Sequence, residues 1–178
     1  NFVGARVDGY DVPRCLLLQP AAAALARVEK RLRRSGYGLR VFDCYRPTRA
    51  VRHFLRWAKD PDDTRTKAEF YPALDKSLLV PDYIASSSGH SRGATVDLTL
   101  VKCAKGRCEP LDMGTPFDLF DARANTASPA ITAAQRKNRE RLVAAMQREG
   151  YANYPMEWWH YTLKNEPSPD TYFDVPIR

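Results

Sequence analysis

The sequence predicts a single domain of the α+β class, with a central antiparallel sheet flanked by helices. Helical and strand patterns alternate along the chain, and no internal repeat or heptad is present. The 178 residues, 44% of them hydrophobic, suffice for one substantial core over residues 1–178 but not comfortably for two. No apolar stretch approaches the roughly 20 residues that cross a bilayer, so we expect a soluble protein without membrane insertion.

The first predicted element is an amphipathic helix over residues 20–32. It begins with a proline, carries apolar residues at helical spacing and is followed by Gly36 as a stop signal. Its basic run, Arg27–Arg34, contains much of the clustered positive charge behind the net charge of +7. Because apolar residues interrupt that run four apart, we interpret it as a solvated helix face and expect no nucleic-acid partner.

A strand and a second helix follow. Residues 38–43 alternate in polarity and lead into a turn at Arg46-Pro47, which is typical of a strand end. Thr48 is predicted to cap a helix over residues 49–59. His53 lies on this helix without an acid or cysteine at ligand spacing, so we interpret it as a packing or surface histidine.

The second half of the chain is predicted to supply two strands and one long helix. Residues 60–88 and 113–129 are rich in turn-forming residues and are expected to be irregular. The alternating segment 94–101 is predicted to be a strand. A basic helix over residues 131–149, ended by Gly150, precedes a predicted strand over residues 156–163.

Two widely separated patches contain two of the three histidines together with acidic side chains. The first, Ser88–Asp97, holds His90 and Asp97, and the second, Glu157–His160, ends in a histidine. Imidazole nitrogens and one carboxylate oxygen suit Zn2+, and a catalytic zinc site uses three protein ligands and leaves a position for water. We therefore expect one Zn2+ per chain, bound by His90, Asp97 and His160.

Glu157 and Arg46 are the predicted catalytic residues. Glu157 has two tryptophans after it that can exclude water, so it could carry a proton from water to the leaving amine. Arg46 could stabilise an oxyanion, although it could instead only pair with Asp43. Glu157 and His160 would face opposite ways on a regular strand, so we expect a local twist or bulge between them.

These and other segments together resemble one family. They are Asn1-Phe-Val-Gly4, Asp8-Gly-Tyr10, Asp43-x-Tyr-Arg-Pro47, Ser88-x-His-Ser-Arg-Gly-x-x-x-Asp-Leu-Thr-Leu100, Met113-Gly-Thr-Pro-Phe-Asp118 and Glu157-Trp-Trp-His-Tyr161. The combination is similar to that of the VanX-like zinc D-alanyl-D-alanine dipeptidases. Each fragment alone is a modest signal, but together they span the chain nearly from end to end.

The resemblance implies a DD-peptidase-like (hedgehog-type) zinc peptidase fold and cleavage of free D-Ala-D-Ala to two D-alanines. It implies zinc on the three ligands already named, with Glu157 as general base and Arg46 at the transition state. It also implies that Ser88 and Asp118 contact the substrate, where Asp118 would pair with the substrate ammonium. As structural alternatives, Ser88 could cap a turn and Asp118 a loop.

The sequence is also compatible with two other functions. A DD- or LD-carboxypeptidase or endopeptidase that trims peptidoglycan stems would need an open cleft without an ammonium trap. A zinc-containing binding module would do no chemistry, although the presence of Glu157 and Arg46 argues against it. A dipeptidase of this kind could serve vancomycin resistance, recycling of peptidoglycan in the cell wall, or the use of D-alanine as a nutrient.

The four cysteines fit no zinc-finger spacing, so we expect no structural metal site. Cys103 and Cys108 enclose a short polar loop that a disulfide could close, against the alternative of two unrelated thiols, and a Cys15–Cys44 bond also stays open. Disulfides favour an exported, periplasmic protein over a cytoplasmic one. The chain begins at Asn1 without methionine, and we expect a signal peptide or another segment ahead of it.

Overall fold

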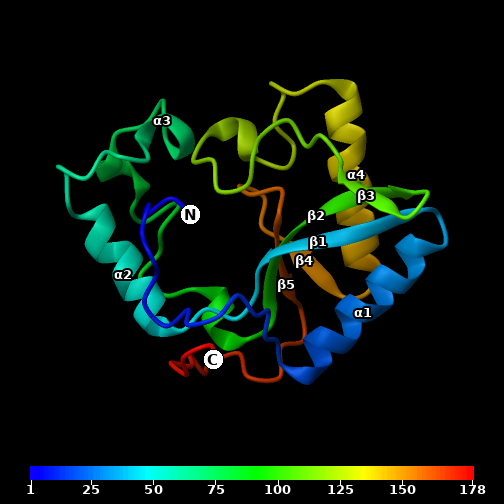
Figure 1. Ribbon diagram of the computed structural model, residues 1–178, viewed down its shortest axis with the longest axis horizontal. Helices are drawn as coiled ribbons and strands as arrows, with labels where there is room; N and C mark the ends of the chain where they lie inside the picture. The colour runs from blue at the N-terminus through cyan, green and yellow to red at the C-terminus, as the bar shows by residue number, and fades with distance from the viewer.

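The computed structural model describes residues 1–178 and has the α+β architecture predicted from the sequence (Figure 1). The main elements, in chain order, are α1 (Gln19–Arg33), β1 (Tyr37–Asp43), α2 (Thr48–Ala58), α3 (Lys67–Phe70), β2 (Thr95–Ala104), β3 (Arg107–Pro110), α4 (Ala133–Arg148), β4 (Tyr151–Asn153) and β5 (His160–Leu163). Three short 3-10 turns complete the set: η1 (Lys76–Leu79), η2 (Gly89–Arg92) and η3 (Ala122–Ala124). None of the helices combines the length and the apolar character needed to cross a membrane.

A five-stranded antiparallel sheet forms the centre of the molecule, and β2 is its longest strand. β2 pairs with β1 along one side, and with β5 and β3 at different parts of its length. β4 extends the sheet beyond β5. The register sets Asp97 of β2 opposite both Asp43 of β1 and His160 of β5, so the sheet itself brings these three residues together.

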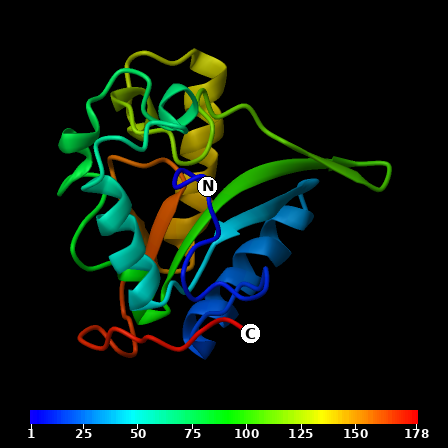
Figure 2. The same cartoon turned by 60° about the vertical axis from the view of Figure 1, so that its left-hand side comes forward.

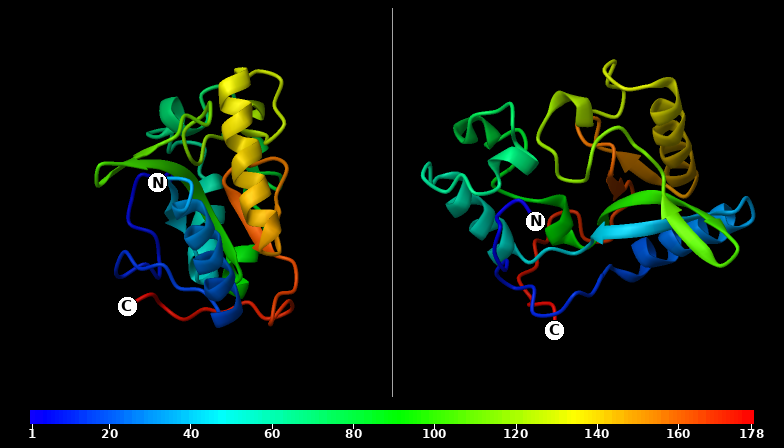
Figure 3. Two further views of the ribbon diagram at one scale, coloured as in Figure 1. Left: turned by 90° about the vertical axis from the view of Figure 1, so that its right-hand side faces the viewer. Right: turned by 45° about the horizontal axis from the view of Figure 1, so that its top comes forward.

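Helices α1 and α4 lie side by side against the sheet (Figure 3). Val28 of α1 and Leu142 of α4 belong to one core cluster with Leu98 and Leu100 of β2, which explains why the apolar residues of both helices recur at helical spacing. The basic residues of α1 face outward, as predicted.

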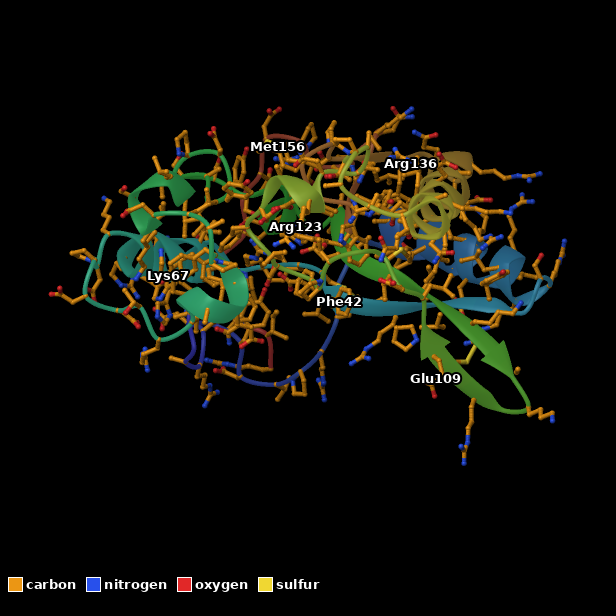
Figure 4. All side chains as sticks on the ribbon, turned by 90° about the horizontal axis from the view of Figure 1, so that it is seen from above. Phe42, Lys67, Glu109, Arg123, Arg136 and Met156 are labelled. Carbon is orange, nitrogen blue, oxygen red and sulfur yellow. A yellow bond between two sulfur atoms is a disulfide. The ribbon has the colours of Figure 1, made fainter.

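A second cluster joins the N-terminal segment to α2. The ring of Phe2 lies 4.7 Å from that of Phe54, 5.3 Å from Trp57 and 5.1 Å from Phe120. Figure 2 shows α2, in cyan, on one side of the molecule and the β2–β3 hairpin extending away on the other. The hairpin carries Glu109, and Figure 4 shows it projecting from the body of the protein.

Some boundaries differ from those predicted. The predicted strand 156–163 is wrong in its first half, because β5 begins only at His160 and residues 155–159 form turns. The prediction omits β4, which at three residues is too short to give a periodic pattern. The irregular segment 60–88 contains the short elements α3 and η1.

The start of α2 also corrects a prediction. Thr48 is not the cap but the first helical residue, and its side chain makes no capping hydrogen bond. The Arg49 N–H instead donates to the Asp174 carboxylate at 2.7 Å. A partner 125 residues away leaves no trace in the local sequence. By contrast, α4 starts with the capping box between Thr132 and Gln135.

All four cysteines form disulfides. Cys103 and Cys108 close the β2–β3 hairpin, which is the bond that the loop composition suggested, and Cys15 joins Cys44. The first bond lies on the projecting hairpin, and the second lies at the end of β1, next to Asp43.

Candidate metal centre

His90, Asp97 and His160 come together from three elements. His90 is on η2, Asp97 is near the start of β2 and His160 is the first residue of β5. One ligand atom from each lies within 4.8 Å of the others. His90 Nε2 is 3.1 Å from Asp97 Oδ2, and His160 Nδ1 is 3.1 Å from Asp97 Oδ1.

Two of the three candidate ligands, His90 and Asp97, are buried and carry a polar atom without a hydrogen-bond partner. His90 and Asp97 are 1% and 2% exposed, and neither His90 Nε2 nor Asp97 Oδ1 has a partner in hydrogen-bonding geometry. Burial alone would raise the pKa of Asp97, but the adjacent imidazoles of His90 and His160 outweigh burial and hold the pKa of that carboxyl below its usual value. Buried polar atoms without partners are rare, so the cluster is suited to a cation.

A hydrogen bond to the backbone fixes the orientation of the His90 ring. Its Nδ1 lies 2.5 Å from the backbone carbonyl oxygen of Cys44. A carbonyl only accepts hydrogen bonds, so Nδ1 carries the proton and donates it. The other ring nitrogen, Nε2, therefore keeps its lone pair free on the side facing Asp97.

Glu157 reaches the same cluster from the turn before β5. Its Oε2 lies 3.5 Å from His160 Nδ1. The His160 N–H donates to the Glu157 carbonyl across this turn. Because the residues between them form a turn and not a strand, the two side chains can lie on the same side. Burial raises the pKa of Glu157 to about 7, and the charge of His160 opposes this effect.

Arg46 follows β1, the strand that pairs with β2 on the side away from β5. Its guanidinium donates to Asp43 at 2.7 and 3.0 Å, and its Nη2 is 3.8 Å from Asp97 Oδ2. The Tyr10 hydroxyl donates to the other oxygen of Asp43 at 2.8 Å. Arg46 thus pairs with Asp43, as the alternative interpretation held, and also faces the cluster.

Asp118 lies in the loop before η3, in the left-handed region with a φ of 61°. Burial raises its pKa well above the usual value, and the nearby Asp97 carboxylate adds to the shift. Arg139 of α4 braces this loop. Its guanidinium donates to the backbone carbonyls of Met113, Arg123 and Asn125, on both sides of Asp118.

Ser88 stands at the start of η2. Its hydroxyl accepts a hydrogen bond from the His90 N–H at 3.3 Å, so the turn-capping alternative describes its local structure. Asp118 by contrast makes no capping contact of the kind that Asp121, three residues later, makes with the Arg123 N–H.

One cavity of about 290 Å³ collects all of the residues predicted from the sequence. They are Arg46, Ser88, His90, Asp97, Asp118, Glu157 and His160. The cavity lies between the two core clusters, with Phe2, Phe54 and Trp159 among its apolar walls.

Sequence patterns assign no role to Tyr10 or to the Cys44 carbonyl. Tyr10 lies in a segment that carries the family resemblance, which was the available signal, whereas a backbone carbonyl has no signature in the sequence. His53 lies apart from the cavity, and its Nδ1 accepts from the Asp8 N–H at 3.2 Å.

Comparisons with known proteins find similarity along the whole chain. A family model described as D-ala-D-ala dipeptidase matches residues 1–178. The chain is 47% identical over 178 residues to a D-alanyl-D-alanine dipeptidase of Streptomyces coelicolor, with 99% of this chain and 87% of the relative covered. It is 41% identical over 179 residues to a D-alanyl-D-alanine dipeptidase of Enterococcus faecium, with 100% and 88% covered.

The fold is also similar to that of a solved structure. A crystal structure of a mutant vancomycin resistance D,D-pentapeptidase VanY in complex with Zn(II) matches with a TM-score of 0.50. The sequence identity is 15%, and the match covers 95% of this chain and 92% of that one. At this identity the likeness concerns the fold alone, and it confirms the predicted fold class.

Proposed function

The chain belongs to the D-Ala-D-Ala dipeptidase family and is a peptidase, and from this premise we propose that it hydrolyses the free dipeptide D-Ala-D-Ala to two D-alanines at a zinc centre. The observation that carries the proposal is the single cavity of about 290 Å³ that all seven predicted site residues line. A cavity of this size suits a small substrate with few rotatable bonds.

The proposed zinc ligands are His90, Asp97 and His160. Two imidazoles and one carboxylate form a donor set that zinc accepts, and the unsatisfied His90 Nε2 and Asp97 Oδ1 support a cation among them. When bound, zinc would supply Lewis acidity toward the peptide carbonyl and would lower the pKa of water.

Glu157 is the proposed general base. A carboxyl with a pKa of about 7 exchanges its proton readily near neutral pH, so it can take a proton from water and pass it to the leaving amine. Its position beside His160 keeps it next to the proposed zinc site.

Arg46 is proposed to stabilise the negative charge that develops on the carbonyl oxygen. Its guanidinium is held by Asp43, and Asp43 in turn accepts from Tyr10, so the cation is fixed before the substrate arrives. A preorganised cation in a cavity screened from water stabilises such a charge more than a mobile one does.

Asp118 and Ser88 are proposed to bind the ends of the dipeptide. Asp118 is a buried carboxyl whose raised pKa reflects burial and the nearby Asp97. A substrate ammonium would supply the positive charge that this carboxyl lacks. Ser88 lines the same cavity and offers a hydroxyl donor.

The test uses the zinc-loaded protein with D-Ala-D-Ala, L-Ala-L-Ala and a stem pentapeptide that ends in D-Ala-D-Ala. We expect D-alanine to be released from the first substrate and little from the other two. Preferential cleavage of the pentapeptide would show that the protein is a stem peptidase and not a dipeptidase. Absence of cleavage with zinc bound would show that it is only a binding module.

We also propose that the protein is exported. Its two disulfides support an oxidising compartment, because cytoplasmic reductants keep thiols reduced. Fractionation of the producing cells should recover the protein outside the cytoplasm. A cytoplasmic pool with four free thiols would overturn this proposal.

A further inference from the structure

The Cys15–Cys44 disulfide includes the residue whose backbone carbonyl is hydrogen-bonded to the proposed zinc ligand His90. The Cys44 carbonyl accepts the Nδ1–H of His90 at 2.5 Å, and Cys44 itself is 2% exposed. Cys15, at the other end of the bond, is exposed. The disulfide thus joins an exposed segment to the residue that orients a proposed ligand.

The segment that begins at Cys15 contacts both the residue after Cys44 and the end of η2. We name Cys15–Leu18 the clamp segment. The Leu16 carbonyl accepts from the Tyr45 N–H at 2.9 Å, and the Leu18 N–H donates to the Gly93 carbonyl at 2.8 Å. Gly93 ends η2, and its own N–H donates to the His90 carbonyl at 3.0 Å.

The clamp segment packs closely on η2. Gly93 has a φ of 75°, and a Cβ there would come within 3.0 Å of Leu18 Cγ. Glycine therefore permits both the left-handed turn and the close approach. The backbone that carries His90 is held between the clamp segment and the end of β1.

We propose that the Cys15–Cys44 disulfide is a positioning element for the metal site, which holds the Cys44 carbonyl where it orients His90 with Nε2 toward Asp97. This inference rests on the proposed zinc site. Hydrogen-bond partners of a metal-bound histidine set its tautomer and ring orientation, and losing them typically weakens metal binding about 10–100-fold. The disulfide acts through the Cys44 backbone and touches no reacting atom.

A second disulfide in the same chain provides the control. Cys103–Cys108 lies on the β2–β3 hairpin, and neither of its residues lines the cavity. Cys108 is exposed, as Cys15 is. Cys15→Ser and Cys108→Ser therefore each break one disulfide from its exposed side and leave one thiol behind.

The first measurement is the zinc dissociation constant, obtained by competition with a chromophoric chelator. We expect Cys15→Ser to weaken zinc binding at least about tenfold and Cys108→Ser to leave it unchanged. The double variant Cys15→Ser/Cys44→Ser should match Cys15→Ser, which excludes the freed Cys44 thiol as a substitute ligand. Equal zinc affinity in Cys15→Ser and Cys108→Ser would overturn the proposal.

The second measurement needs no metal. In metal-free wild-type protein and in Cys108→Ser, the His90 Nδ1–H should give a protected imidazole signal in NMR spectra. Cys15→Ser should lose this signal through exchange with water while its far-UV circular dichroism stays unchanged. Retention of the signal in Cys15→Ser would overturn the inference. If wild-type protein bound no zinc, the proposed function would fail, and this comparison would still decide the role of the disulfide.

Discussion

Asp97 is the residue at which the sheet, the histidines and the buried arginine meet. Its backbone lies opposite Asp43 and His160 in the sheet register, and its carboxylate faces His90, His160 and Arg46. A carboxylate this deeply buried is stable only with cations around it. The proposed site therefore depends on charge balance as much as on geometry.

Replacing the proposed base should separate chemistry from metal binding. Glu157→Gln keeps the size of the side chain but removes its ability to accept a proton, so kcat for D-Ala-D-Ala should fall about 10²–10⁴-fold. Zinc content, measured by atomic absorption, should stay at the wild-type level. Glu109→Gln on the projecting hairpin is the matched control and should keep full activity. Unchanged kcat in Glu157→Gln would remove Glu157 from the mechanism.

Replacing the proposed ammonium partner should act on substrate binding. Asp118→Asn should lower kcat/KM for D-Ala-D-Ala about 10–100-fold, because a charge-assisted hydrogen bond is lost. The loss should be far smaller with N-acetyl-D-Ala-D-Ala, which has no ammonium group. Asp121→Asn, outside the cavity, serves as the control. Equal losses with both substrates would show that Asp118 does not recognise the ammonium.

At the scale of elements, the turn before β5 and the loop before η3 are held together. The Trp158 indole N–H donates to Thr115 at 2.8 Å, and the Trp158 backbone N–H donates to the Ala124 carbonyl. Arg139 supports the same loop from α4, and burial lowers its pKa to about 10. Glu157 and Asp118 thus stand on segments that are cross-braced rather than free.

The contact between α1 and the end of α4 should depend on pH. Glu149 accepts from Arg27 and Arg31, and these hydrogen bonds hold its pKa below the ordinary 4.5. Its contribution to stability is therefore present above about pH 4.5 and is lost as the pH falls through the lower folded-state pKa. Glu149→Gln should lower the Tm by about 2 °C at neutral pH, and the difference should vanish in acid.

The control for this prediction is a glutamate within α4. Glu140 is exposed and forms no ion pair, so Glu140→Gln should leave the Tm unchanged across the pH range. Thermal unfolding followed by circular dichroism from about pH 7 to about pH 2 gives the comparison. A Glu149→Gln effect that persists undiminished at the acid end would contradict the ion-pair explanation.

At the scale of the whole molecule, the cavity lies where two core clusters meet. One cluster joins the sheet to α1 and α4, and the other joins α2 to the N-terminal segment. The three proposed ligands stand on η2, β2 and β5, so a cation bound at this place would join segments that are far apart in the sequence. A bound cation would stabilise the native arrangement beyond the effect of either cluster.

Removal of zinc should accordingly lower thermal stability without unfolding the protein at room temperature. Free zinc at about 100 times its dissociation constant should add about 2.7 kcal/mol to the free energy of unfolding. For a chain of this size, that corresponds to a rise in Tm of about 5–10 °C over the chelated protein. Magnesium at the same concentration should have little effect. Identical melting curves with zinc and with chelator would argue against the proposed ligands.

The sequence predicts the regular parts of this molecule better than its connections. The apolar spacing of α1 and the alternation around Asp97 sufficed for a helix and a strand, because both patterns reflect burial against one core. The sequence does not predict contacts between distant segments. Two examples are the Asp174 carboxylate that caps α2 and the Cys44 carbonyl that accepts from His90. The site residues came from motifs and from a family resemblance, whereas their support depends on tertiary packing.

The projecting β2–β3 hairpin offers a practical opportunity. A Cβ added to Gly106, at its tip, would meet no atom within 4 Å, and the Cys103–Cys108 bond secures the strands below it. Exposed loop tips accept inserted sequence well. A short peptide tag placed after Gly106 should allow the enzyme to be anchored to a bead or sensor surface through a loop that contributes no residue to the cavity.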